Sequence, residues 1–374
     1  MLSWVHFGDL HASAEDDWQS LAHLRRLVRD VNQHLAGLAD FAFLPGDNAN
    51  HGAEDQYGRI LEVLSGLKLD WFAIPGDHDF EPGSLDNFYR GLRAATLPHC
   101  AQIKGRRCLF LDVVSHGRGG PDFRLGRDQL AWLVAQLERS RGDRGRPAAF
   151  MHAFPGDLAE DAEEVAAVFA EARIACVDTG HTHYNELLND GTVIYTATRS
   201  TGQIEEGPVG FSLHAVDGAV ASWRFKPLEQ PWPFVLITSP ADHRLVTDPR
   251  QPDQAPQGGF AVRAKVFGAD VAQVLLALEN GPPIAMTKTP GEAGSWTAEV
   301  LAPARGLLAL SVTAVAADGS RDTDAIVTRI GASDAVVRRK AGTKLGDHVH
   351  SIGAWPERGL LGTQLGPNKN GRKW

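Results

Sequence analysis

The sequence predicts an α/β layered domain over residues 1–228, an all-β sandwich over residues 234–331 and a glycine-rich basic tail over residues 332–374. Three observations support this division. Short apolar runs alternate with helical patterns in the first part, which is typical of α/β proteins. Pro231-Trp232-Pro233 cannot continue a regular element and marks a linker. After Phe234, short strands and turn signals follow one another closely.

The first part contains short apolar runs that we expect to form strands. They are Leu2–Phe7, Asp40–Leu44, Asp70–Ile74, Arg107–Val114, Ala148–Met151, Ile174–Asp178, Val193–Thr198, Gly210–Val216 and Ala219–Phe225. The last three lie close together, with turns such as Asp217-Gly218, and this spacing indicates an antiparallel edge.

Helical patterns lie between these strands. The expected helices are Asp17–Leu35, Glu54–Leu64, Ser84–Leu92, Gly126–Arg139 and Glu160–Glu171. In the first of them leucines and valines recur at helical spacing, and Asp16 or Asp17 is the expected cap.

The second part has the size and pattern of a small immunoglobulin-like sandwich. Its expected strands are Phe234–Ile237, Gly259–Phe267, Ala272–Glu279, Gly294–Val300, Gly306–Ala316 and Ala325–Ile330. The tail carries eight basic and three acidic residues. We expect it to pack on the acidic body or to act as a lid, with a solvated C-terminus as the alternative. The sandwich or the tail is the expected surface for any homo-oligomer.

Composition narrows the range of functions. The net charge of -9 argues against binding of duplex nucleic acid. No apolar run is long enough to span a membrane, and the start of the chain lacks the pattern of a secretory signal. Cys100, Cys108 and Cys176 do not make a disulfide framework, so we expect a reduced, cytoplasmic protein.

The chemically informative residues follow the predicted strands. Five strands each end in Asp or His, in most cases just after a glycine. The segments are Gly8-Asp9-Leu10-His11, Gly46-Asp47-Asn48-Ala49-Asn50, Gly76-Asp77-His78-Asp79, Met151-His152 and Gly180-His181-Thr182-His183. Ligands bind outside the carboxyl ends of strands in α/β sheets, and glycine allows the sharp turns needed there.

These segments supply seven nitrogen or oxygen ligands, too many for one tetrahedral ion. Asp9 and His11 are two residues apart, so both face the same way on an extended segment, and the same holds for His181 and His183. The number suits two ions about 3.5–4 Å apart with a shared carboxylate. Imidazole and carboxylate together favour manganese, iron or zinc, as a divalent or mixed-valence pair.

The ordered set of five segments resembles the calcineurin-like metallophosphoesterases, in particular their bacterial branch similar to cyclic-nucleotide phosphodiesterases. The resemblance covers residues 1 to about 225. It implies a four-layer αββα sandwich, with two mixed sheets flanked by helices. It also implies a role for each matching residue: Asp9, His11 and His183 bind the first metal, Asp47 bridges, and Asp77, His152 and His181 bind the second. His78 assists the leaving oxygen and Asp79 orients His78.

One position departs from the pattern of this family, which has Asn where this chain has Asp77. Our hypothesis is that the extra negative charge weakens the attraction for a dianionic monoester more than for a singly charged diester, or favours a trivalent ion.

Four further residues are weaker candidates for substrate binding, namely Asn48, Asn50, His51 and Arg199. For Asn50 the alternative is a hydrogen bond within the loop, and for Arg199 a surface ion pair. His6 and His116 are expected to be structural.

The resulting prediction is a hydrolase that uses hydroxide activated by two metal ions to cleave a small soluble phosphodiester, for example a cyclic nucleotide. The same site could act on a phosphomonoester, a phospholipid head group or a nucleic-acid end. A different class of function, an inactive metal-binding scaffold, is the second alternative.

Overall fold

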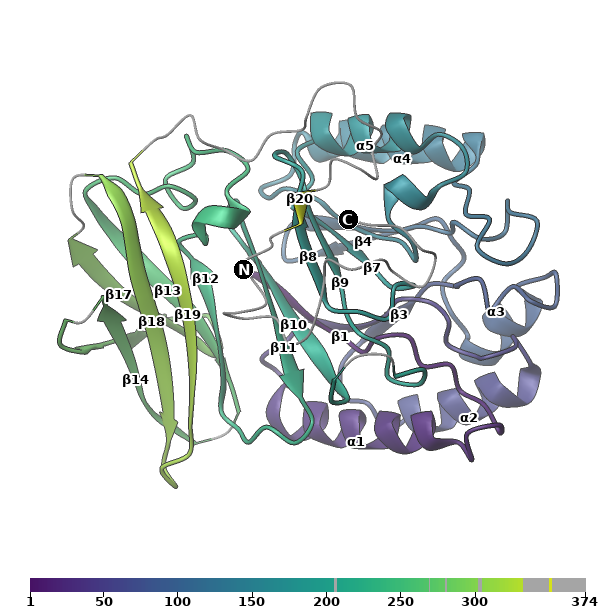
Figure 1. Ribbon diagram of the computed structural model, residues 1–374, viewed down its shortest axis with the longest axis horizontal. Coiled ribbons are helices and arrows are strands. Elements are labelled where there is room, and N and C mark those ends of the chain that lie inside the picture. The colour runs from purple at the N-terminus through teal and green to yellow at the C-terminus, as the bar shows by residue number, and fades with distance from the viewer. Residues whose placement is uncertain (205–206, 269, 280, 302–304, 332–349, 352–374) are drawn as a thin grey trace.

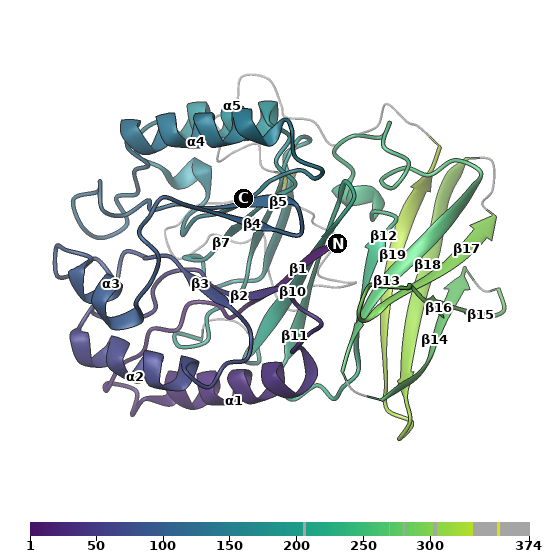
Figure 2. The same cartoon turned by 180° about the vertical axis from the view of Figure 1, so that it is seen from behind.

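The computed structural model describes residues 1–204, 207–268, 270–279, 281–301, 305–331 and 350–351. Figure 1 shows a larger α/β part joined to a smaller all-β part, and Figure 2 shows the same arrangement from behind. The α/β part contains two sheets.

The first sheet has five strands in the order β11-β10-β1-β2-β3. Its strands are β1 (Leu2–His6), β2 (Phe41–Leu44), β3 (Trp71–Ala73), β10 (Gly210–Asp217) and β11 (Val220–Pro227). Strands β1, β2 and β3 are parallel, and β10 and β11 continue the sheet as antiparallel strands. The helices of this half are α1 (Gln19–His34), α2 (Glu54–Leu64) and α3 (Asp86–Leu92).

The second sheet has the order β20-β8-β9-β7-β6-β5-β4. Its strands are β4 (His99–Ile103), β5 (Arg106–Phe110), β6 (Ala148–Phe150), β7 (Cys176–Thr179), β8 (Glu186–Asn189), β9 (Ile194–Ala197) and β20 (His350–Ser351). Its helices are α4 (Arg127–Ser140), α5 (Ala162–Glu171) and a short 3-10 turn, Pro155–Asp157.

The two sheets pack face to face, with helices on both outer sides. Residues alternate along β1, so that Trp4 packs between the sheets and Val5 packs in the core toward the helices. Phe43 and Phe150 meet across the sheets at 4.8 Å between ring centroids. Helices α1 and α2 lie along one side and α4 and α5 along the other (Figure 1). The predicted four-layer arrangement is therefore confirmed.

A buried polar cluster also joins the sheets. The carboxylate of Asp178 on β7 accepts hydrogen bonds from Trp4 Nε1 at 2.8 Å and Thr196 Oγ1 at 2.8 Å, and lies 2.9 Å from His6 Nδ1. His214 stacks on Trp4. A buried carboxylate is costly unless it is hydrogen-bonded, and here three neighbours satisfy it. The same cluster of His6, Asp178 and His214 could also hold a metal ion, so the structural role of His6 stays a prediction.

The all-β part consists of two antiparallel four-stranded sheets that share one core. One contains β12 (Phe234–Ser239), β13 (Gly259–Phe267), β16 (Thr287–Lys288) and β17 (Ser295–Leu301), and the other contains β14 (Val271–Leu278), β15 (Ile284–Ala285), β18 (Gly306–Ala316) and β19 (Arg321–Ile330). A second 3-10 turn, His243–Leu245, follows β12. An all-β second part is therefore confirmed, while its immunoglobulin-like topology stays a prediction.

Three features differ from the sequence prediction or lie outside it. Strands β4, β8, β15 and β16 were not predicted. Strand β9 was expected at an antiparallel edge with β10 and β11, but it belongs to the other sheet, where it runs parallel to β7. Most of the basic tail lies outside the described residues. The part of the tail that is described, His350–Ser351, forms β20 and pairs with β8.

Candidate metal centre

The structure brings the seven predicted ligands together in two groups of four that share Asp47. In each group the ligand atoms lie within 4.8 Å of one another, and every residue is buried. The first group contains Asp9, His11, Asp47 and His183, and the second contains Asp47, Asp77, His152 and His181. Segments that are more than 170 residues apart in the chain, such as Asp9 and His181, are joined by a hydrogen bond.

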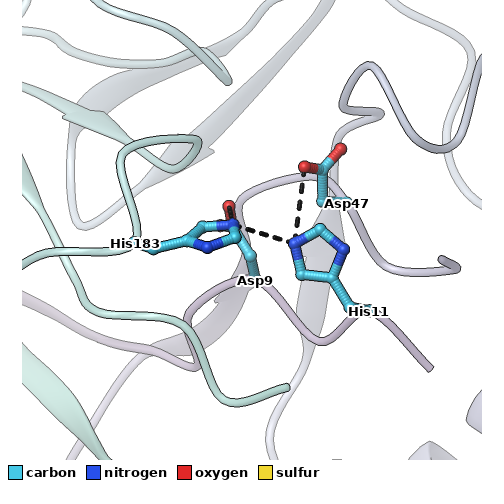
Figure 3. Close-up of side chains that lie close together, drawn as sticks. All are labelled: Asp9, His11, Asp47 and His183. Carbon is cyan, nitrogen blue, oxygen red and sulfur yellow. Dashed lines mark hydrogen bonds and ion pairs between the residues drawn. The ribbon is translucent and has the colours of Figure 1, made fainter. Parts of the chain in front are cut away.

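In the first group the side chains point toward one common position (Figure 3). Nε2 of His11 lies 2.9 Å from Nε2 of His183 and 3.6 Å from Oδ2 of Asp47. Nε2 of His183 lies 3.5 Å from Oδ2 of Asp9. Two imidazole lone pairs and two carboxylates that converge in this way suit one transition-metal cation.

The second group is built around Asp77. Its Oδ1 lies 3.3 Å from Nε2 of His152 and 3.4 Å from Nδ1 of His181. The other ring nitrogen of His152, Nδ1, lies 2.8 Å from the carbonyl oxygen of Pro45. If Nδ1 donates its proton to that carbonyl, the Nε2 lone pair is left for a cation, as is usual for metal-binding histidines.

Two buried oxygens test whether these residues fit metal ions. Oδ1 of Asp9 and Oδ2 of Asp47 have no hydrogen-bond partner among the described residues. A buried carboxylate oxygen without a partner costs free energy that a bound cation would recover. The residues present therefore fit a pair of metal ions.

The backbone at the ligands is unusual. His11, Asp47, His181 and His183 have φ angles of 44°, 49°, 67° and 62°, in the left-handed region. Non-glycine residues held there store about 1–3 kcal/mol each. The two ligands of each pair were expected to face the same way because their segments are extended. Asp9 and His11 do join the same group, whereas His181 and His183 belong to different groups. Left-handed turns at His11, His181 and His183 aim these side chains instead.

Three glycines leave room for the ligand side chains. A Cβ at Gly46 would lie 2.3 Å from Nδ1 of His152, one at Gly76 would lie 2.2 Å from Oδ1 of Asp47, and one at Gly180 would lie 2.4 Å from Oδ1 of Asp9. Of these three only Gly46 has a positive φ. At Gly76 and Gly180 the lack of space for a Cβ explains the glycine, because neither residue has a positive φ.

The charged groups of the centre shift the pKa values of one another. Burial alone would raise the pKa of the Asp47 carboxyl, but the imidazoles of His152, His11 and His78 hold that pKa well below its usual range. Burial would lower the pKa of His152, but Asp47 and Asp77 raise it well above its usual range. A metal ion must displace the proton that His152 holds, so metal affinity should rise with pH.

The contacts of Asp79 differ from the expectation that it orients His78. Its buried carboxylate accepts hydrogen bonds from the backbone N–H groups of Asn48, Ala49 and Gly76, at 2.9–3.1 Å. Asp79 therefore fastens two ligand-bearing loops to each other. Burial and nearby Asp47 raise its pKa to about 6.

His78 takes its orientation from other groups. Its Nδ1 lies 2.8 Å from the carbonyl oxygen of Asn50 and 3.2 Å from Oε1 of Glu81. Its ring stands edge-on to His11, with 4.7 Å between centroids. The side chain is 24% exposed, so a substrate can reach it.

The weaker candidates for substrate binding are placed differently from one another. Asn48 is fully buried and donates to the carbonyl of Ile74, so it does not face solvent. His51 lies at the surface between Glu15 and Glu81. The guanidinium of Arg199 is buried over the ring of Phe225, which contradicts the alternative of a surface ion pair, while its role in substrate binding stays a prediction.

Three residues near the centre were missed. The hydroxyl of Tyr57 donates to Oδ1 of Asp79 at 2.8 Å, Glu81 contacts His78, and the amide of Gln203 lies beside His11. Nothing in the local sequence identifies them. The contacts of Tyr57 and Gln203 join segments that are distant in the chain, and Glu81 belongs to no recognisable motif.

The α/β part has two paired sheets, and its strand ends carry two ligand groups around a shared carboxylate. This fold and this site together are typical of a metal-binding protein of the phosphoesterase type. Comparison with known proteins agrees. Residues 3–185 match the family described as calcineurin-like phosphoesterase. The chain thus contains a calcineurin-like metallophosphoesterase domain.

One curated relative is the glycerophosphodiester phosphodiesterase GpdQ of Enterobacter lignolyticus, which is 30% identical over 133 residues. The match covers 33% of this chain and 46% of the relative, so the chain spans about half of the relative's length. Similar solved structures include a dimetal phosphatase from Danio rerio, with 15% identity and a TM-score of 0.48 over 61% of this chain and 96% of that one. Another is GAP50, an inner membrane complex anchor of Plasmodium, with 11% identity and a TM-score of 0.44 over 61% and 85% of the two chains.

Within the described part of the chain, none of the helices combines the length and the apolar character that crossing a bilayer requires.

Proposed function

We propose that this protein is a metal-dependent phosphodiesterase that hydrolyses a small soluble diester. The observation that carries the proposal is the pair of buried ligand groups that share Asp47. Two ions bridged by one carboxylate can hold both the attacking and the leaving oxygen of an in-line displacement at phosphorus. The family of the domain supports this chemistry.

We assign the ligands as the sequence predicted them. Asp9, His11 and His183 hold one ion, Asp77, His152 and His181 hold the other, and Asp47 belongs to both groups. Manganese, iron and zinc all suit this mixture of imidazole and carboxylate. When bound, such ions lower the pKa of water and offset charge on phosphoryl oxygens.

His78 is the residue we assign to the leaving oxygen. The carbonyl of Asn50 accepts from Nδ1, so Nε2 carries a second proton only when the ring is an imidazolium. The ring of His78 packs against His11 and remains partly exposed. As an imidazolium it could donate the Nε2 proton to the leaving oxygen of a substrate bound beside the first ligand group.

A diester is favoured over a monoester for two reasons. The curated relative is named as a phosphodiesterase. The centre also contains three buried carboxylates, Asp9, Asp47 and Asp77, which disfavour a dianion more than a monoanion.

The all-β part and the tail remain outside this chemistry in our proposal. We propose residues 1–228 as the catalytic domain and residues 234–331 as a packing or recognition domain. Apart from β20, residues 332–374 lie outside the described residues. Their packing on the body or action as a lid therefore stays a prediction.

Turnover of bis-p-nitrophenyl phosphate and of p-nitrophenyl phosphate, measured with manganese, iron and zinc, tests the proposal. We expect faster turnover of the diester and loss of turnover in Asp47→Asn, with Asp190→Asn, a buried aspartate in the β8–β9 turn, as control. Faster turnover of the monoester would make the protein a phosphomonoesterase. Metal binding without turnover of either ester would favour the inactive scaffold.

A further inference from the structure

The segment that follows β9 supports the first ligand group from outside the region matched by the family. The carbonyl oxygen of Asp9 accepts three hydrogen bonds from it: Ser200 Oγ at 2.9 Å, Thr201 N at 2.9 Å and Gly202 N at 3.2 Å. All of these residues follow position 185, where the family match ends. The segment therefore fixes the backbone that carries Asp9.

The backbone of this segment packs closely against the backbone around Asp9. A Cβ at Gly202 would lie 2.0 Å from the carbonyl oxygen of Leu10, and one at Gly8 would lie 2.3 Å from the carbonyl oxygen of Arg199. This close packing places the next side chain, Gln203, directly beside His11.

The amide of Gln203 contacts the ring nitrogen of His11 that faces away from the ligand group. Its Nε2 lies 3.2 Å from Nδ1 of His11 and 3.0 Å from Oδ1 of Asn50. The opposite nitrogen of the same ring, Nε2, lies 2.9 Å from His183 and is the atom aimed at the first metal position.

A neutral imidazole carries its proton on one nitrogen only. If Gln203 donates to Nδ1, the proton of His11 sits on Nε2 and blocks a metal. A metal at Nε2 requires the proton on Nδ1, which then needs an acceptor. Rotation of the Gln203 amide by half a turn supplies one, because its oxygen and nitrogen then exchange places. Asn50 can turn in the same way and keep its contact with Gln203, but its Nδ2 then leaves Nε2 of His51 at 3.0 Å and Oε2 of Glu15 at 3.4 Å.

We propose that Gln203 is a positioning residue of the metal centre, whose side-chain oxygen accepts the Nδ1 proton of His11 and so holds the Nε2 lone pair toward the metal. The inference rests on the proposed function, because it assumes that His11 is a ligand. The side chain of Gln203 is exposed, so its replacement should leave folding intact.

Three variants test the inference. Gln203→Met keeps the length of the side chain and removes the acceptor, Gln203→Glu keeps the acceptor, and Gln102→Met is a control at an exposed glutamine on β4. Binding of Zn²⁺ is measured by competition with a chelator. The Co²⁺-loaded proteins are compared by their solvent-exchangeable, hyperfine-shifted N–H proton signals, which report hydrogen bonding of metal-bound histidines.

We expect Gln203→Met to weaken one of the two Zn²⁺ affinities about 10–100-fold, the usual effect of losing such a partner, and to lose one exchangeable signal. Gln203→Glu should keep that signal and Gln102→Met should match the wild type. If Gln203→Met binds within twofold of the wild type, or if Gln203→Glu loses the signal too, the inference is wrong while the proposed function stands. A wild-type protein that binds no Zn²⁺ overturns both.

Discussion

Replacement of Gly76 by alanine should lower the metal content of the centre without unfolding the protein. A Cβ at this position would lie 2.2 Å from Oδ1 of Asp47, 2.4 Å from the backbone nitrogen of Asp47 and 2.6 Å from Cε1 of His152. Ordinary contacts begin at 3.4 Å, so the shared ligand Asp47 must move by about 1 Å. Metal sites tolerate displacements of only about 0.2 Å.

The stability of Gly76→Ala should fall by about 1–3 kcal/mol, as for other overpacked cores. Gly58→Ala is the matched control, because Gly58 lies within α2 and nothing lies within 4 Å of the added Cβ. This second substitution should stabilise the helix by about 0.5–1 kcal/mol.

The assay combines metal content after loading and gel filtration with the free energy of unfolding in urea. We expect fewer than two ions per chain in Gly76→Ala and the full complement in Gly58→Ala. If Gly76→Ala is cooperatively folded, carries both ions and turns over diester at the wild-type rate, then the space at Gly76 does not position Asp47 as we argue.

Three further predictions concern charge and buried hydrogen bonds. Asp77→Asn should raise turnover of p-nitrophenyl phosphate relative to bis-p-nitrophenyl phosphate, because it removes a negative charge from the centre; an unchanged ratio would defeat this explanation. Tyr57→Phe should lower the free energy of unfolding in urea by about 1.5–3 kcal/mol, since it removes a donor to buried Asp79, and no change would show that the bond is unimportant. Burial lowers the pKa of Lys226 to about 8. Between that pH and the ordinary value of 10.5 the unfolded chain holds a proton that the folded chain has lost, so stability should rise with pH by about 1–3 kcal/mol in the wild type relative to Lys226→Met. A difference that stays constant from pH 7 to about 10.5 would refute it.

The sequence predicted correctly those features that depend on residues close to one another in the chain. Apolar runs predicted β1, β2 and β3, and the Asp and His residues that follow them converge as expected, because the carboxyl ends of parallel strands share one edge of a sheet. Strand β8 carries Glu186 and Asn189 at its ends and is only four residues long, so it lacks a clear pattern.

Contacts between distant segments could not be predicted in the same way. Asp79 was assigned to its neighbour His78, whereas its partners Asn48 and Ala49 lie on another loop. Strand β9 was grouped with its neighbours in sequence, although its pairing with β7 decides its sheet. From its place after a strand, Arg199 was a candidate for substrate binding or for a surface ion pair, but its guanidinium lies over Phe225 of the adjoining sheet.

The central claim is that two cations occupy the two ligand groups that share Asp47. Anomalous diffraction from crystals grown with Zn²⁺ tests it most directly. We expect two peaks, one among Asp9, His11, Asp47 and His183 and one among Asp47, Asp77, His152 and His181. Peaks elsewhere on the molecule, or a fully loaded protein with a single peak in this region, would contradict it.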